Sequence, residues 1–163
     1  MFIDRCQLVR DMLDNPAITT DIIVGFPGET EEEFQASINV SRTCGFSKIH
    51  IFPFSARKGT PAATYDGQLS QGLKDERLQR LIEVETELRN AYHRSLLGRE
   101  LSILVEGALQ EADHDGGLAL VQGTACRYAQ VVASAPPATI NYLTKVRAVR
   151  LQNHQIQAEW LPV

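Results

Sequence analysis

The sequence predicts an α/β segment over residues 1–97 followed by a small all-β barrel over residues 98–163. In the first part, apolar residues recur at helical spacing beside short apolar runs that are typical of buried strands. From Gly98 onward, short alternating segments are separated by turn residues instead. With 163 residues, of which 44% are hydrophobic and 22% charged, the chain has the composition of one or two globular domains.

A helix is expected at the start of the chain, with its end marked by Asn15 and Pro16. Its apolar residues share one face at helical spacing, namely Phe2, Cys6, Val9 and Leu13. The next element is a strand over 18–24. Its nearly continuous apolar run is typical of a strand that is buried on both sides in a parallel sheet.

Residues 25–29 predict a tight turn, and Thr30 and Glu33 follow it at the spacing of a capping box. The helix that begins there is expected to end near Cys44 and Gly45, with a second strand over 47–52. Its inward positions would be Phe34, Ile38 and Val40. Strand, helix and strand at these lengths predict a βαβ unit.

A segment of about twenty residues, 53–72, has no clear periodicity, and loops of that length are usually functional or disordered. A long helix is then expected over about 74–97. Its apolar stripe predicts packing against the core or between domains, and consists of Leu78, Leu81, Ile82, Leu88, Tyr92 and Leu96.

Five short strands are expected in the second part, over 101–105, 118–122, 130–133, 143–151 and 155–161. Turn signals separate them, notably 114–117, Pro136–Pro137 and Asn153. Short strands at such spacing are typical of a small β-barrel.

Composition and charge exclude several classes of function. The formal charge is −4, so any contact with RNA must come from a local basic patch. No segment is apolar for long enough to span a bilayer, and the charged first residues do not resemble a signal peptide, which predicts a cytoplasmic protein. Three widely spaced cysteines predict neither a disulfide framework nor a metal or iron–sulfur site within the chain.

Two loops at the carboxyl ends of the predicted parallel strands are where an α/β fold binds ligands. In the first, Gly25 would let the backbone approach a ligand, although a structural tight turn explains the same residues. The second, 54–60, is polar and basic through Arg57 and Lys58, which suits an anionic substrate or a solvated loop. No nucleophile–base pair, carboxylate pair or metal cluster completes a catalytic site, so no catalytic residue is assigned.

Residues 20–30, TDIIVGFPGET, resemble the fifth barrel strand of radical S-adenosylmethionine methylthiotransferases. The resemblance extends to Phe54-Ser55, Arg57, 59–63 and the Lys74, Glu76, Arg77 and Leu81 positions. Residues 45–55, GFSKIHIFPFS, look like the branch that modifies threonylcarbamoyladenosine in tRNA, more than the relative acting on isopentenyladenosine. Residues 98–162 resemble the RNA-binding TRAM domain of this family at Gly98, Val105-Glu106, Gly123-Thr124, Tyr128 and Val131.

The resemblance implies a partial (β/α) barrel fragment followed by a TRAM barrel. It implies S-adenosylmethionine contacts at Ile23, Val24, Gly25, Phe52, Pro53 and Phe54. It also implies tRNA contacts at Arg57, Lys58, Arg127, Tyr128, Lys145 and Arg147, with Arg57 or Lys58 alternatively facing the threonylcarbamoyl carboxylate. For Arg57, a structural ion pair is an equally good interpretation.

The family uses S-adenosylmethionine and two 4Fe–4S clusters, but the cluster-binding cysteine motifs are not in this sequence. We therefore expect the chain to bind no cluster and to be inactive alone, with an N-terminal half or a separate chain as partner. The expected function is the C-terminal part of an enzyme that adds a methylthio group to C2 of threonylcarbamoyladenosine next to the anticodon. A non-catalytic RNA-binding module, the isopentenyladenosine-modifying relative and a structural remnant are the alternatives.

Overall fold

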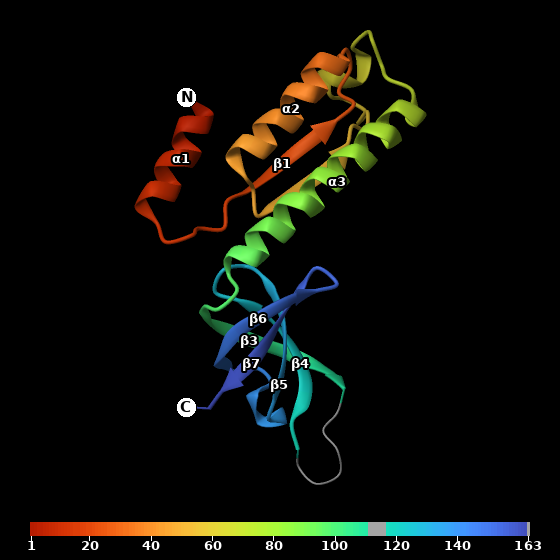
Figure 1. Ribbon diagram of the computed structural model, residues 1–163. Helices are drawn as coiled ribbons and strands as arrows, with labels where there is room; N and C mark the ends of the chain where they lie inside the picture. Colours follow the sequence, from red (N-terminus) through yellow and green to blue (C-terminus); the bar gives the residue numbers. More distant parts are fainter. Residues whose placement is uncertain (111–116, 163) are drawn as a thin grey trace. The chain divides into compact units, whose positions relative to one another are not determined.

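The computed structural model describes residues 1–110 and 117–162, and the chain divides into two compact units, Met1–Arg89 and Asn90–Val163. The long helix α3, Gln71–Ser95, contains the point of division (Figure 1). The change in sequence character at Gly98 follows the end of this helix by a few residues. None of the described helices has the length and apolar character needed to cross a membrane.

The first unit is built around a two-stranded parallel sheet. Its elements before α3 are α1 (Phe2–Met12), β1 (Thr19–Val24), α2 (Glu31–Cys44), β2 (Lys48–Pro53) and the short 3-10 helix η1 (Pro61–Thr64). The strands pair from Thr19 opposite Lys48 to Val24 opposite Pro53, so the predicted βαβ unit is confirmed.

One face of this sheet forms the core with helices α2 and α3. Val24, Phe34 and Leu81 have no exposed surface, and they pack with Ile38, Val84 and the half-buried Ile22, Ile51, Leu78 and Leu88. A second cluster joins α1 to α2 and β2, and consists of Cys6, Cys44, Phe46 and Ile49. Apart from Val40, which is half-buried, the inward positions expected for α2 are buried.

Both ends of α2 follow the local sequence. The Thr30 hydroxyl accepts a hydrogen bond from the Glu33 N–H, and a Glu33 carboxylate oxygen accepts one from the Thr30 N–H. Gly45 ends the helix in the left-handed region at φ 58°, which glycine adopts without strain. The predicted capping box and helix end are confirmed.

The expected burial of β1 on both sides is wrong for this chain. The second face of the sheet is open, and on it Asp21 lies opposite the exposed His50 while the half-exposed Ile23 lies opposite Phe52. Ile23 and Phe52 are 54% and 51% exposed there. An apolar run predicts burial, but the packing element need not be in the same sequence.

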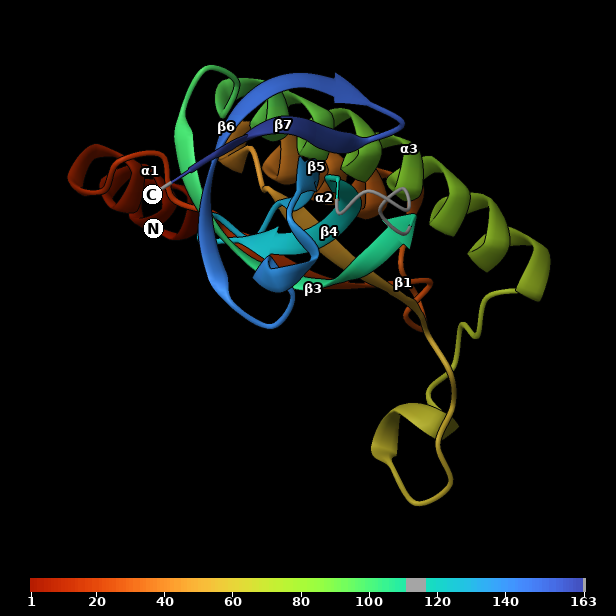
Figure 2. The same cartoon turned by 90° about the horizontal axis from the view of Figure 1, so that it is seen from below.

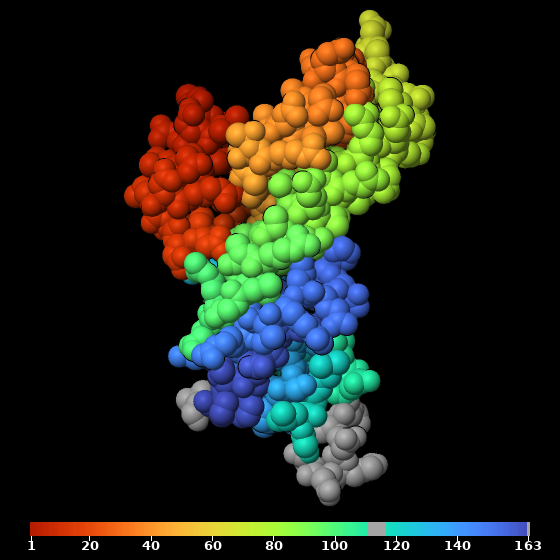
Figure 3. All heavy atoms as spheres, in the orientation of Figure 1, coloured from red at the N-terminus to blue at the C-terminus, as the bar shows by residue number. Residues whose placement is uncertain are grey.

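The expected apolar stripe of the first helix is also mostly exposed. Of its four residues only Cys6 is buried, because only the side of α1 that faces α2 has a packing partner among the described residues. Figure 3 shows α1 as a separate bulge beside α2. On α3, Ile82 is exposed, whereas Leu81 and Tyr92 of the expected stripe are buried, as is Leu96 in the turn directly after the helix.

The second unit is a closed five-stranded barrel. Its strands are β3 (Glu100–Gln110), β4 (Ala119–Ala125), β5 (Gln130–Ala135), β6 (Leu143–Gln152) and β7 (Gln155–Leu161), with a 3-10 turn η2 (Pro137–Thr139). They close in the order β3–β4–β5–β7–β6, antiparallel except for the parallel β5–β7 pair. The five predicted strands are confirmed, whereas the turn signal at 114–116 lies outside the described residues.

Alternation of buried and less buried residues builds the barrel interior most regularly in β4, whereas Val131, Val132 and Ala133 of β5 are all buried. In β4 every second residue is buried, and the core residues include Leu101, Ile103, Val105, Val121, Val131, Val146 and Ile156. Gly123 is required by the close approach of β3, since a Cβ there would lie 2.1 Å from the Leu104 carbonyl oxygen. The indole N–H of Trp160 donates to the Thr144 hydroxyl at 3.0 Å.

Candidate functional site

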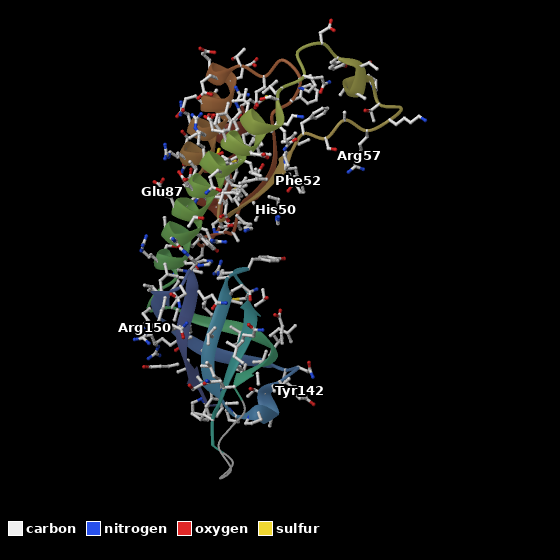
Figure 4. The ribbon with its side chains drawn as sticks, turned by 90° about the vertical axis from the view of Figure 1, so that its right-hand side faces the viewer. His50, Phe52, Arg57, Glu87, Tyr142 and Arg150 are labelled. Atoms are coloured by element: carbon white, nitrogen blue, oxygen red, sulfur yellow. The ribbon has the colours of Figure 1, made fainter. Side chains whose placement is uncertain are left out.

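A hollow of about 440 Å³ opens where β1 and β2 end. Ile23 and Phe52, directly opposite each other in the sheet, form part of its apolar wall. The rest of the lining comes from Pro53, Phe54, Ser55, Arg57, Thr60 and Ala62. Figure 4 shows His50, Phe52 and Arg57 on one side of this unit and Glu87 on the other. An apolar wall with one cation and two hydroxyls at its rim suits a ligand with a flat apolar part and a polar or anionic part.

The turn between β1 and α2 is held by a buried charge pair. One carboxylate oxygen of Glu29 accepts hydrogen bonds from the Gly25 N–H at 2.7 Å and from the Arg77 guanidinium at 2.6 Å. Arg77 also donates to the Glu29 carbonyl oxygen at 3.0 Å. Gly25 has φ 73°, and a Cβ there would lie 2.6 Å from Cγ of Lys74. The turn beside the hollow is therefore fixed by α3.

Three aromatic side chains meet beside the hollow, and we call them the aromatic group: Phe26, Phe54 and Tyr65. The Phe26 and Phe54 ring centres are 5.2 Å apart in an edge-to-face arrangement, and those of Phe26 and Tyr65 are 6.2 Å apart. The Lys74 ammonium lies 5.4 Å from the centre of the Phe54 ring. Phe54 belongs to both the aromatic group and the hollow, so the wall at this point is backed by packed rings.

The segment after β2 loops out from the sheet and carries Arg57 (Figure 2). The Arg57 carbonyl accepts hydrogen bonds from the N–H and the hydroxyl of Thr60, at 3.1 and 2.8 Å. This turn fixes the backbone, while the Arg57 side chain has no ion pair among the described residues. A cation left unpaired beside an apolar hollow is available to an anionic ligand.

The structure brings together four of the six residues expected at the cofactor, namely Ile23, Phe52, Pro53 and Phe54. Val24 instead points into the core, as strand alternation from Ile23 requires, and Gly25 lies in the turn. Arg57 lines the hollow, whereas Lys58 is exposed and is not among the lining residues.

Several residues of this site were not predicted from the sequence. Ser55, Thr60 and Ala62 lie in the loop expected to be functional, but no spacing rule shows which of its residues turn back toward the strands. The contact between Glu29 and Arg77 joins residues 48 positions apart, so no local pattern could reveal it.

The barrel residues expected to contact RNA lie in two neighbouring regions, on β6 and in the turn after β4. Lys145 and Arg147 both point outward from β6, with Arg147 ion-paired to Glu100 at 2.8 Å. Lys145 lies opposite Ser102 of β3, and the Ser102 carbonyl accepts a hydrogen bond from the Cys126 N–H in the turn after β4. Arg127 and Tyr128 follow in that turn, so they lie one strand away from Lys145.

The cysteines do not converge on one point. Cys6 and Cys44 are buried in the same cluster of the first unit, whereas Cys126 is exposed in the second. Burial, together with a hydrogen bond to Cys6, raises the pKa of the Cys44 thiol to about 11. Among residues 1–110 and 117–162, no three His, Cys, Asp or Glu side chains are grouped so that they could hold a metal ion.

Homologues named as tRNA methylthiotransferases cover most of this chain. It is 36% identical over 149 residues to the threonylcarbamoyladenosine tRNA methylthiotransferase MtaB of Bacillus subtilis. The matched stretch is 91% of this chain and 32% of that protein. It is 44% identical over 136 residues to the tRNA-2-methylthio-N(6)-dimethylallyladenosine synthase of Mycolicibacterium gilvum, 83% of this chain and 25% of the relative.

A third relative, the synthase of the same name from Symbiobacterium thermophilum, is 46% identical over 99 residues, 61% of this chain and 21% of that protein. The chain thus spans between a fifth and a third of the length of these three relatives. No family model matches the sequence.

Proposed function

We propose that this chain is the part of a radical S-adenosylmethionine tRNA methylthiotransferase that forms one wall of the cofactor pocket and carries an RNA-binding barrel. The observation that carries the proposal is the hollow at the ends of β1 and β2, in a chain whose homologues are named as tRNA methylthiotransferases. Ligands of α/β folds bind at this edge of the sheet. A tRNA-modifying role implies a cytoplasmic location.

The first domain, residues 1–97, is proposed to be a segment of a (β/α) barrel. Two strands alone make a poor sheet, and the face that carries Asp21, Ile23, His50 and Phe52 is open to solvent. In a complete barrel such a face would point inward and be covered by other strands. Residues 98–163 are proposed to be the TRAM domain, which the closed barrel of described strands supports.

The hollow fits the adenosine part of S-adenosylmethionine. Ile23 and the Phe52–Phe54 segment would pack on the adenine, while the Gly25 turn, held by Glu29 and Arg77, keeps the strand end in place. When bound there, the cofactor would supply the methyl group and the radical chemistry of the reaction. Two buried thiols in one unit and one exposed thiol in the other do not fit a 4Fe–4S cluster. We propose that the chain is inactive until another polypeptide segment provides the cluster ligands.

The tRNA is proposed to contact both units. Arg57 at the rim of the hollow, with Lys58 beside it, would bind the RNA backbone or a carboxylate on the modified base. In the barrel, Lys145 and Arg127 would bind the tRNA backbone. Tyr128, in the same turn as Arg127, would stack on an exposed base.

Threonylcarbamoyladenosine is the proposed nucleoside substrate. The resemblance of residues 45–55 to that branch and the MtaB similarity over 91% of the chain support it. The higher identity to dimethylallyladenosine synthases over shorter stretches favours the second candidate, the isopentenyl-type nucleoside. An Arg57 guanidinium can pair with the carboxylate of threonylcarbamoyladenosine, and the isopentenyl group offers no such partner.

A binding titration tests the proposal with three forms of one tRNA: unmodified, carrying threonylcarbamoyladenosine, or carrying isopentenyladenosine. We expect the threonylcarbamoyl form to bind tightest, and Arg57→Gln to remove the preference. Arg42→Gln is the matched control, because Arg42 is an exposed cation on α2 that is already paired with Glu87. Preference for the isopentenyl form would select the second candidate. Absence of tRNA binding at low salt would refute the proposal for this chain.

A further inference from the structure

An aromatic and apolar patch lies on the outside of the barrel. Leu104 of β3 and Leu143 of β6 are directly opposite each other, and Tyr142 immediately precedes β6. Their exposed fractions are 45%, 75% and 68%. We call these three residues the Tyr142 patch. Exposed apolar residues scattered singly need no explanation, but here two exposed leucines are paired across strands and an exposed tyrosine immediately precedes one of them.

The backbone beneath the patch is fixed. The Tyr142 carbonyl accepts a hydrogen bond from the Val105 N–H at 3.1 Å, and the Asn141 N–H donates to the Val105 carbonyl at 2.8 Å. Val105 has no exposed surface, so both bonds attach Tyr142 to the barrel core. The backbone that carries the exposed ring is therefore ordered before any partner binds, which lowers the entropy cost of binding.

The patch has a cation on one side and a hydrogen-bonded acid on the other. Lys145 lies two residues after Leu143 on the same face, and it has no ion pair among the described residues. On the other side of the patch, Leu104 also lies opposite Thr124 of β4, so Leu143, Leu104 and Thr124 form a row across three strands. The acid on this side, Glu106, accepts a hydrogen bond from the Thr124 hydroxyl at 2.7 Å. A cation flanking an aromatic surface is the combination that binds single-stranded nucleic acid.

We infer that the Tyr142 patch is a binding site for an unstacked base of the tRNA, with Lys145 on the adjoining phosphate. This rests on the proposed function and adds to it a residue set that no sequence motif indicated. Tyr142 supplies the stacking surface, while Leu104 and Leu143 provide the apolar contact at the edge of the base. Arg150 is not part of this surface, since Figure 4 shows it on the side of the barrel away from Tyr142.

The test measures fluorescence anisotropy of labelled tRNA with the full chain at several salt concentrations. Base–aromatic stacking predicts that Tyr142→Ala binds about tenfold more weakly at every salt concentration, with the salt slope unchanged. Lys145→Gln should instead reduce the slope by about one. Tyr142→Phe should retain the affinity, and Leu143→Ser should weaken it. Leu118→Ser is the matched control, because Leu118 is an exposed barrel leucine outside the patch.

The outcomes separate the inference from the proposed function. Wild-type binding that is unaffected by Tyr142→Ala and Leu143→Ser would overturn the inference and leave tRNA binding intact. Loss of affinity in Tyr142→Ala that Tyr142→Phe does not restore would also overturn it, because the ring would not be what binds. No wild-type binding at low salt would overturn both. Trp160 fluorescence confirms that each variant keeps the folded barrel, since Trp160 is the single tryptophan.

Discussion

Replacing Arg77 with methionine tests whether the buried pair with Glu29 stabilises the first unit. Methionine keeps an unbranched apolar stem at this position but removes the guanidinium, whose Cζ lies 5.3 Å from the centre of the Phe34 ring, and with it every N–H donor. The change leaves a carboxylate on Glu29 with only the Gly25 N–H as a partner in this turn. The folded state must then hold a nearly buried charge without its counter-ion.

The size of the effect follows from the burial of the two side chains. Arg77 is 3% exposed and Glu29 is 12% exposed, and their shortest contact is 2.6 Å. Removing one partner from a buried, hydrogen-bonded pair costs about 3–5 kcal/mol. The barrel offers a matched control in Arg147 and Glu100, which form a 2.8 Å pair at 50% and 55% exposure. Arg147→Met should cost less than about 1 kcal/mol, because exposed pairs contribute little.

Urea denaturation followed by two signals gives the measurement. Far-ultraviolet circular dichroism follows the helices, which lie mainly in the first unit, while Trp160 fluorescence follows the barrel. Arg77→Met should lower the midpoint of the helical transition and leave the Trp160 transition nearly in place. Glu29→Gln in the same background should show strong coupling in a double-mutant cycle. A loss in Arg77→Met no larger than in Arg147→Met would refute the reasoning.

Three further predictions concern packing, pH and exchange. Gly123→Ala should destabilise the barrel by about 1–3 kcal/mol by urea denaturation, because the Leu104 backbone cannot move aside, whereas Gly107→Ala meets no atom within 4 Å and should be nearly neutral. Burial raises the pKa of Cys44 from 9.0 to about 11, so the unfolded chain loses this proton first, and the free energy of unfolding should fall between pH 9 and 11. Cys44→Ala should remove that part of the fall, and an unchanged profile would contradict the assignment. Amide exchange should be faster in β1 and β2 than in the barrel strands, and equal protection would contradict the view that the two-stranded sheet is incomplete.

Local signals predicted the elements, because caps, turns and strand alternation act over a few residues. Thr30 and Glu33 specified the start of α2, Gly45 its end, and the alternation of the second part specified the five barrel strands. Local signals did not determine whether both faces of β1 are buried. An apolar strand shows that it needs covering, but the sequence alone does not show whether the covering element belongs to this chain.

The candidate site was predicted in part. The position of the hollow followed from the rule for parallel strands, and Ile23, Phe52 and Arg57 are found there. Period-two alternation could have excluded Val24 from the lining, since it must face away from Ile23. No local pattern in the sequence indicated the Tyr142 patch, because Leu104 becomes the neighbour of Leu143 only through the pairing of β3 with β6.

The ring of strands has a consequence for how partners of this protein can change. Each described barrel strand already has a hydrogen-bonded neighbour on both sides, so a partner cannot be recruited by extending the sheet. Recognition of a partner must then depend entirely on the side chains that project from the closed barrel. At the binding site that we propose, exchanging Tyr142 or Lys145 would change what the barrel can contact while the framework stays the same.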